Sequence, residues 1–211
     1  MTTLYFHPLS TPSLYPLFVA KAASVAHTRK VVNLQTQEQQ SDEYLAINPF
    51  GRVPALVDED FAIGESGAIG RYLARKSGSD IYSEDFRDAA RIDQWVEFIV
   101  HHIRVNVGRV QYNRFIAPMI NEPVDTASMA LGEKFLAANL PHIERALSGE
   151  SYLHGDRLTL ADIALIAALE PRHTAKLELT DFPVLTAWLD ATRKLDWYQS
   201  VHTHFGAEMG L

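Results

Sequence analysis

Apolar residues in the first part of the chain alternate between short β-like runs and helical spacing, with polar turns between them. A helix is expected with Ser13 as its N-cap, because Pro16 then falls in the first turn, where its missing N–H does no harm. The patterns follow the order β-α-β and then β-β-α, which predicts a compact α+β unit. The expected strands cover residues 4–7, 29–34, 54–57 and 61–63, and the expected helices cover residues 13–25 and 65–76.

The pattern changes after the polar turn at residues 77–80 and is helical from there on. Apolar residues three or four positions apart indicate one long helix, and Pro118 followed by Pro123 marks its end. A stripe with this spacing is typical of a helix face that packs into a core. Its members are Ile92, Val96, Ile99, Ile103, Val107 and Val110.

Thr159 and Asp162 form a capping pair in front of a short, strongly apolar helix, which gives Asp162 a structural role. The chain is therefore divided into a thioredoxin-like domain over residues 1–77, a linker over residues 78–87 and an all-helical bundle over residues 88–211. Further helices of the bundle are expected over residues 127–147, 163–169, 182–192 and 197–201.

Composition narrows the classes of function. The chain has 211 residues, 47% of them hydrophobic, and a formal net charge of −7 without a basic patch, so we expect no nucleic-acid partner. No apolar stretch approaches the roughly 20 residues that span a bilayer, and the first residues lack a secretory signal pattern, which predicts a cytoplasmic protein with no membrane partner. Cysteine is absent, which excludes disulfides and a protein thiol nucleophile.

The segment from Asn48 to Leu56 has the most informative chemistry. Pro54 opens a short strand, where a proline is tolerated because it donates nothing to the sheet. We predict that the Val53-Pro54 bond is cis, which would turn the chain sharply and present the backbone N–H and C=O of Val53 outward. An extended peptide would then pair with Val53 as an additional strand.

Glu65 and Ser66 follow at the start of the next helix. The backbone N–H groups of a helix N-terminus, together with the Ser66 hydroxyl, favour a carboxylate. One small, extended, acidic peptide would therefore use both features, with its backbone on Val53 and its carboxylate at Ser66.

Histidines provide a weaker signal for a metal. His101 and His102 are adjacent on one helix and point in different directions, and His202 and His204 lack a supporting carboxylate cluster. We therefore expect no metal site.

Four groups of motifs follow one another along the chain. They are Leu4-Tyr5 with Pro8-Leu9-Ser10, Asn48-Pro49-Phe50-Gly51 with Val53-Pro54-Ala55-Leu56, Glu65-Ser66 with Ala68-Ile69 and Tyr72-Leu73, and Tyr152-Leu153-His154-Gly155-Asp156 with Leu158-Thr159-Leu160-Ala161-Asp162. With these motifs in this order, the chain resembles the cytosolic glutathione transferases over essentially its whole length, and its motifs are most similar to those of the serine-using phi and theta classes. The resemblance implies a thioredoxin-like α+β domain followed by an all-α domain. The missing cysteine excludes the cysteine-using classes.

The resemblance implies a role for each matching residue. Ser10 matches the serine whose hydroxyl donates to the sulfur of glutathione, and Val53 matches the residue whose backbone pairs with the cysteinyl unit. Pro54 matches the cis proline, and Glu65 and Ser66 match the pair that holds the γ-glutamyl end.

Three positions depart from the phi pattern. Gln39 and Gln40 stand where a His-Lys pair near the glycine carboxylate is common, and neutral amides would hold that carboxylate less strongly. Arg52 stands where a glutamine is common and would supply the missing positive charge.

Other hydroxyl groups near Ser10 compete for the thiol-activating role. Ser13, Thr11 and Tyr15 lie close by in the sequence, and Tyr5 and His7 alternate with apolar residues on the preceding strand. A helix cap is the simpler interpretation of Ser13, and packing or surface roles are simpler for Tyr5 and His7. Ser10 remains the favoured residue.

The function expected is transfer of glutathione to a hydrophobic electrophile by a homodimer, with glutathione as co-substrate and no other cofactor. The electrophile pocket is expected from the loop after Phe6, residues 104–112 and the tail around Phe205. Two alternatives stay open: a non-catalytic glutathione-binding protein of this fold, and a specialised glutathione-dependent isomerase or dehalogenase. A thiol-disulfide oxidoreductase is disfavoured because it would need a protein cysteine.

Overall fold

The computed structural model describes residues 1–201, and the chain folds into two compact units. One unit contains Met1–Tyr82 together with the segment that begins at Asp196, and the other is Ser83–Leu195. The observed division between Tyr82 and Ser83 falls inside the linker predicted over residues 78–87. Residues 196–201, by contrast, were expected in the helical bundle but are grouped with the first unit.

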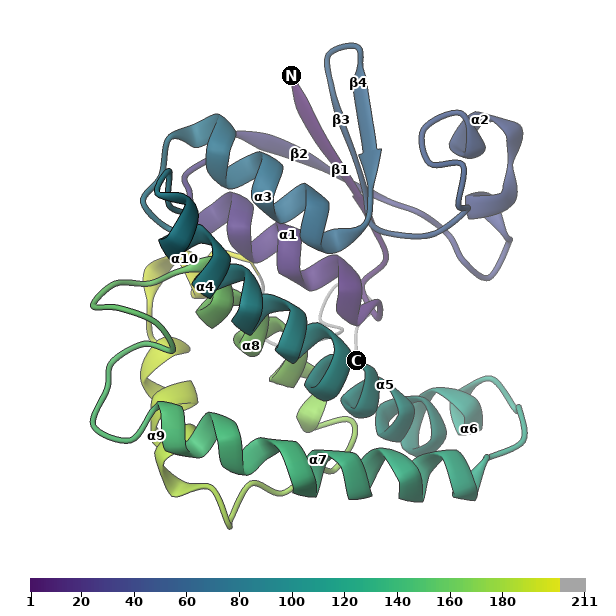
Figure 1. Ribbon diagram of the computed structural model, residues 1–211. Helices are drawn as coiled ribbons and strands as arrows, with labels where there is room; N and C mark the ends of the chain where they lie inside the picture. Colours follow the sequence, from purple (N-terminus) through teal and green to yellow (C-terminus); the bar gives the residue numbers. More distant parts are fainter. Residues whose placement is uncertain (202–211) are drawn as a thin grey trace. The chain divides into compact units, whose positions relative to one another are not determined.

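The first unit is built around a mixed four-stranded sheet with the strand order β2-β1-β3-β4. β1 and β2 are parallel, and β3 runs antiparallel to both β1 and β4. Figure 1 shows α1 and α3 side by side, and these helices also contact β1 and β3. The elements are β1 (Thr2–Phe6), α1 (Thr11–Ala22), β2 (His27–Val31), a 3₁₀ turn (Glu38–Gln40), α2 (Asp42–Leu45), β3 (Ala55–Asp58), β4 (Phe61–Gly64) and α3 (Ser66–Ser77).

The core of this unit lies between the sheet and the two helices. Its fully buried side chains come from strands at Leu4 and Leu56 and from helices at Phe18, Ile69 and Leu73. The observed β-α-β and β-β-α order confirms the α+β, thioredoxin-like prediction for this part of the chain.

Helix α1 begins two residues earlier than predicted. Ser10, not Ser13, is the N-cap residue, and the backbone of Ser10 is extended at φ −87° and ψ 105°. Pro12 stands in the first turn, where its missing N–H is tolerated, and Pro16 lies inside the helix. Because Ser13 is then the third helical residue, its side chain is buried and does not cap the helix.

Asp58 ties the far end of β3 to α3. Its carboxylate accepts hydrogen bonds from the hydroxyl groups of Thr2 (3.0 Å) and Tyr72 (2.5 Å) and forms an ion pair with Lys76. These contacts, Lys76 foremost, lower the pKa of Asp58 to about 2. The strand and the helix are therefore held together at the end opposite to the β3 N-terminus.

The second unit is helical, as predicted. One continuous helical stretch from Phe86 to Met119 includes two π-helical segments, and its predicted apolar stripe from Ile92 to Val110 is fully buried. The π segments shift the register within the stretch, which residue spacing does not reveal. The elements are α4 (Phe86–Phe98), a π segment (Ile99–Arg104), α5 (Val105–Gln111), a π segment (Tyr112–Ile116), α6 (Ala117–Met119), α7 (Thr126–Ala146), α8 (Leu160–Leu169), a 3₁₀ turn (Glu170–Arg172) and α9 (Pro183–Thr192).

Helix α8 is buried along its whole length and packs against α4 and the first π segment. Asp162 closes its N-terminus by accepting hydrogen bonds from the backbone N–H groups of Leu153 and Thr159 and from the Thr159 hydroxyl, each at 2.8 Å. The structural role predicted for Asp162 is thereby confirmed. Burial raises the pKa of this carboxyl to about 6.

The short helix α10 (Asp196–Gln199) packs in the first unit. The ring of Phe18 on α1 stacks on Tyr198 at a centroid distance of 5.3 Å and meets Trp197 edge-on at 5.8 Å. Arg29 also donates a hydrogen bond to the carbonyl of Val201 at 3.1 Å. The prediction that this segment belongs to the bundle was wrong, because a short aromatic segment carries no sequence signal of which core it joins.

Candidate functional site

Strand register brings the predicted site residues to one end of the sheet. Tyr5 near the end of β1 pairs with Ala55 at the start of β3, and Ala55 pairs with Gly64 at the end of β4. The loop after β1, the segment before β3 and the residues after β4 therefore meet at this end. Those segments carry Ser10, Val53, Pro54, Glu65 and Ser66.

The carbonyl of Arg52 fixes the backbone in front of β3. It accepts hydrogen bonds from the Tyr44 hydroxyl (2.8 Å) and from the Asn48 side-chain amide (2.7 Å). In a trans peptide the C=O and the following N–H point in opposite directions, so the Val53 N–H points away from these two side chains. Within residues 1–201, the backbone groups of Val53 make no hydrogen bond. The Val53-Pro54 bond is cis, which confirms that prediction.

Asn48 holds the segment in front of β3, a role that its place in the sequence motif did not reveal. Its side chain is 1% exposed, and its Oδ1 also accepts the Phe50 N–H at 3.2 Å. A Cβ on Gly64 would lie 2.8 Å from that Oδ1, so only glycine leaves room for this side chain. An asparagine in front of a proline is a local sequence signal for a turn, but nothing in the sequence indicated that Asn48 packs against Gly64.

Gln40 and Gly51 form a second close contact, within the segment that precedes β3. The Gln40 side-chain amide donates to the Gly51 carbonyl at 3.1 Å, and a Cβ on Gly51 would lie 2.6 Å from that amide nitrogen. Gly51 also has φ +58°, a conformation that glycine adopts readily. The Gln40 amide nitrogen is thus engaged in holding the loop, whereas the buried Oε1 of neighbouring Gln39 has no hydrogen-bond partner among the described residues.

No side chain of residues 1–201 caps the N-terminus of α3. Its N-cap residue, Glu65, is exposed and adopts φ 65° and ψ 117°, an unfavourable left-handed conformation for a residue with a side chain. Ser66, the first helical residue, is 8% exposed. The N–H groups of the first helical turn have no intrahelical acceptors, so this end favours an anion.

Ser10 lies half-buried between β1 and α1. Although it occupies the N-cap position, its hydroxyl makes no capping hydrogen bond, and no other bond to it occurs among the described residues. Its backbone N–H donates to the His7 carbonyl at 2.9 Å, which holds the loop in place. The hydroxyl therefore remains free to donate to a ligand.

The competing hydroxyl groups are held elsewhere. Ser13 is 0% exposed, and its Oγ accepts the His7 N–H at 3.4 Å. The Tyr15 side chain is 4% exposed and packs so closely on α3 that a Cβ on Gly70 would lie 2.5 Å from the Tyr15 ring. Thr11 is also buried, at 6%.

His7 shapes the loop that leads to Ser10. Its Nδ1 accepts the Leu9 N–H at 3.2 Å, which requires that this nitrogen carry no proton. Burial lowers the pKa of His7, so the ring is neutral at neutral pH. It therefore orients the loop without contributing a charge. Nearby on the sheet, Tyr5 meets Tyr44 edge-on with a centroid distance of 6.0 Å, which fits the packing role expected for it.

Arg52 provides a positive charge at the same end of the sheet. Its side chain is exposed, and its guanidinium forms no ion pair or hydrogen bond within the described chain. Its carbonyl is fixed by Tyr44 and Asn48, so its backbone position is well defined while its side chain is able to reach a ligand.

The histidines and the helices were also assessed for a metal site and a membrane span. Residues 1–201 contain no group of three His, Cys, Asp or Glu side chains that would hold a metal ion. His101 is exposed and lies 3.2 Å from Glu97. His202, His204 and Phe205 lie outside the described residues. None of the described helices has the length and hydropathy required to cross a membrane.

Comparison with known proteins identifies the family. The N-terminal domain model of glutathione S-transferases matches residues 2–75, and the C-terminal domain model matches residues 115–196. Glutathione S-transferase F10 of Arabidopsis thaliana is 31% identical over 90% of this chain and 91% of its own length. Glutathione S-transferase 3 of Zea mays is 32% identical over 89% of this chain and 87% of its own length.

Solved structures agree with these relatives. Glutathione transferase F2 from Populus trichocarpa has a TM-score of 0.88 and 27% identity, covering 99% of this chain and 98% of the other. Glutathione S-transferase I from Mais, in complex with an atrazine glutathione conjugate, has a TM-score of 0.86 and 28% identity, covering 95% of both chains. This chain belongs to the cytosolic glutathione transferase superfamily and is phi-like.

Proposed function

We propose that this chain binds glutathione at the sheet end of its first unit and transfers it to hydrophobic electrophiles, with Ser10 as the residue that stabilises the thiolate. The outward direction of the Val53 N–H carries the proposal. It offers an antiparallel partner to the cysteinyl backbone of glutathione, at the end of the sheet that also holds Ser10 and Ser66. The maize structure with a bound glutathione conjugate supports the same chemistry in a relative.

The hydroxyl of Ser10 would act by donating a hydrogen bond. A free thiol has a pKa near 8.5, and each unit of lowering requires about 1.4 kcal/mol of selective stabilisation of the anion. A hydrogen bond to a charged sulfur contributes about 1.5–3 kcal/mol, and the nearby N-terminus of α1 adds about 0.3–1 kcal/mol. Together they would lower the thiol pKa by about one to three units without deprotonating the serine.

The two ends of glutathione would be held by different groups. The γ-glutamyl carboxylate would accept hydrogen bonds from Ser66 and the free N–H groups of α3, and the Glu65 carboxylate would face the γ-glutamyl ammonium group. At the glycine end, Arg52 would supply the charge, since the Gln40 amide nitrogen already bonds to Gly51. Gln39 would contribute a neutral contact.

The reaction then proceeds by nucleophilic attack. The thiol proton passes to solvent, and the sulfur forms a bond to an electrophilic carbon while a leaving group departs with the electron pair of the broken bond. No cofactor other than glutathione as co-substrate is required. Assembly as a homodimer and location in the cytoplasm remain part of this proposal.

The Ser10→Ala variant tests the proposal. We expect kcat/KM at neutral pH to fall about ten- to a hundred-fold, because about 1.5–3 kcal/mol of thiolate stabilisation is lost. Glutathione affinity should change little, and the pKa read from the pH profile of kcat/KM should rise. Ser13→Ala is the matched control, since it removes a buried hydroxyl from the same helix. An unchanged pH profile in Ser10→Ala would refute the role of Ser10.

A second candidate function, a glutathione-binding protein without catalysis, is favoured by the neutral Gln39 and Gln40 pair. Retention on immobilised glutathione together with no turnover of any tested electrophile would support it. An isomerase or dehalogenase would share the glutathione site, and product analysis would distinguish it from a conjugating enzyme.

A further inference from the structure

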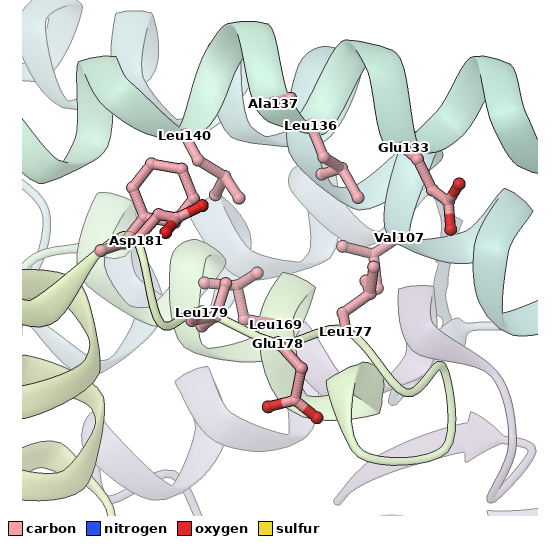
Figure 2. Close-up of a pocket in the computed structure, with 11 residues that line it drawn as sticks. Val107, Glu133, Leu136, Ala137, Leu140, Leu169, Leu177, Glu178, Leu179 and Asp181 are labelled. Atoms are coloured by element: carbon pink, nitrogen blue, oxygen red, sulfur yellow. The ribbon is translucent and has the colours of Figure 1, made fainter.

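The second unit contains a pocket of about 280 Å³ between α7 and the segment that follows the 3₁₀ turn at residues 170–172. Figure 2 shows leucines from α7 facing Leu169, at the end of α8, and Leu177 and Leu179 of that segment. Of the residues that line the pocket, Val107 alone falls in the stretch expected from sequence to line the electrophile pocket. The lining residues are Val107, Glu133, Leu136, Ala137, Leu140, Leu169, Leu177, Glu178, Leu179, Asp181 and Phe182.

The interior of the pocket is apolar. Leu136, Leu140, Leu169 and Leu179 are each at most 8% exposed, so the walls of the pocket are packed apolar side chains. Phe182 adds an aromatic ring, whose face attracts cations. An apolar lining with a few polar groups at the edge is the usual composition of a small-molecule site.

The charged groups in the lining are all carboxylates. Among the described residues that line the pocket, the charged ones are Glu133, Glu178 and Asp181, and none is Lys, Arg or His. Figure 2 shows their carboxylates around the leucines rather than among them. Glu133 is paired with Arg114, which also donates to the backbone carbonyls of Ala175 and Lys176 at 2.9 Å. Within the described chain, Glu178 and Asp181 form no ion pair.

We propose that this pocket binds small hydrophobic organic cations, with the apolar body among the leucines and the positive group near Glu178 and Asp181. Burial of the apolar body supplies affinity in proportion to the area removed from water. The carboxylates select the sign of the charge, because an anion there would meet two like charges and a neutral compound would gain nothing from them. The site lies entirely within the second unit and is independent of the proposed function of the first.

Calorimetry with three matched probes tests the proposal: phenylbutylammonium, phenylbutanol and phenylbutyrate, each with and without saturating glutathione. We expect the cation to bind more tightly than the alcohol, the anion to bind most weakly, and glutathione to have no effect. Absence of binding by the cation, or equal binding of the three probes, would overturn the proposal. Competition by glutathione would place the probe in the proposed catalytic site instead and would also overturn it.

Two charge-matched double variants separate local from general electrostatics. Glu178→Gln/Asp181→Asn should weaken binding of the cation about five-fold and leave the alcohol unchanged. Glu150→Gln/Asp190→Asn removes the same charge from exposed positions outside this pocket and should leave both unchanged. An equal loss in both variants would assign the effect to the net charge of −7 and refute the site. Ala137→Phe, which narrows the pocket, should weaken binding of the cation and the alcohol alike.

Discussion

The helices α3 and α8 both have a polar N-cap residue, but only α8 has its N-terminus capped by a described side chain. At α8, Asp162 is fully buried and accepts three hydrogen bonds from Leu153 and Thr159. At α3, Glu65 is exposed in a left-handed conformation, and none of the described side chains caps the helix. A helix end that satisfies its own donors stabilises the fold, whereas one that leaves them open is prepared for an external anion.

The largest effect that separates the two ends is expected from Asp162→Asn. An asparagine would place an NH₂ donor against groups that are themselves donors, so the free energy of unfolding should fall by about 2–4 kcal/mol. Denaturant titration monitored by circular dichroism measures this change. Glutathione affinity of the folded variant should be unaffected.

Asp156→Asn is the matched control, because Asp156 is exposed in the loop that precedes α8. Its stability should stay within about 0.5 kcal/mol of the parent protein. A similar loss in both variants would show that the loop, and not the buried cap of α8, determines the stability.

Stability measured over a range of pH tests the structural role of the buried Asp162 at the N-terminus of α8. Burial raises the pKa of Asp162 from 3.8 to about 6, so the folded protein binds more protons than the unfolded chain between these values. The contribution of Asp162 to the free energy of unfolding should therefore increase as pH falls from about 7 to about 4, by about 1–3 kcal/mol. The stability difference between the parent protein and Asp162→Asn, measured by denaturant titration at each pH, should widen toward acid. A difference that narrows toward acid would contradict this assignment.

The contrast also shows what the sequence is able to predict. The Thr159–Asp162 spacing is local and correctly identified the α8 cap. Short β-like runs correctly identified the sheet, and apolar residues three or four positions apart correctly identified the helical unit. The prediction that Ser13 caps α1 was wrong. The helix begins at Thr11 with Pro12 in its first turn, so Ser13 is a buried residue inside the helix.

Side-chain partners inside irregular loops could not be predicted from the sequence. Tyr44 and Asn48 are close to Arg52 in the chain, but their bonds to its carbonyl depend on a loop conformation that no residue spacing specifies. The space that Gly64 leaves for Asn48 depends on a contact between separate segments. The roles of Ser10, Val53 and Ser66 in binding glutathione stay predictions, since their positions fit a ligand that only a binding measurement tests.

The smallest effect is expected at the open end of α3, in the variant Ser66→Ala. Loss of one hydrogen bond to the γ-glutamyl carboxylate should weaken glutathione binding by about 1.5 kcal/mol, roughly ten-fold, as measured by calorimetry. The free energy of unfolding should hardly change, because the Ser66 side chain does not cap the helix.

Ser77→Ala makes the same substitution at the other end of α3, where the Ser77 hydroxyl donates to the Ala74 carbonyl at 2.8 Å. It should leave glutathione affinity intact. If Ser66→Ala instead lowered stability and spared affinity, the α3 terminus would be a structural cap like that of α8, and the functional difference between the two helix ends would disappear. If Ser66→Ala lowers glutathione affinity and Asp162→Asn lowers the free energy of unfolding, then the N-terminus of α3 serves the ligand and the N-terminus of α8 serves the core.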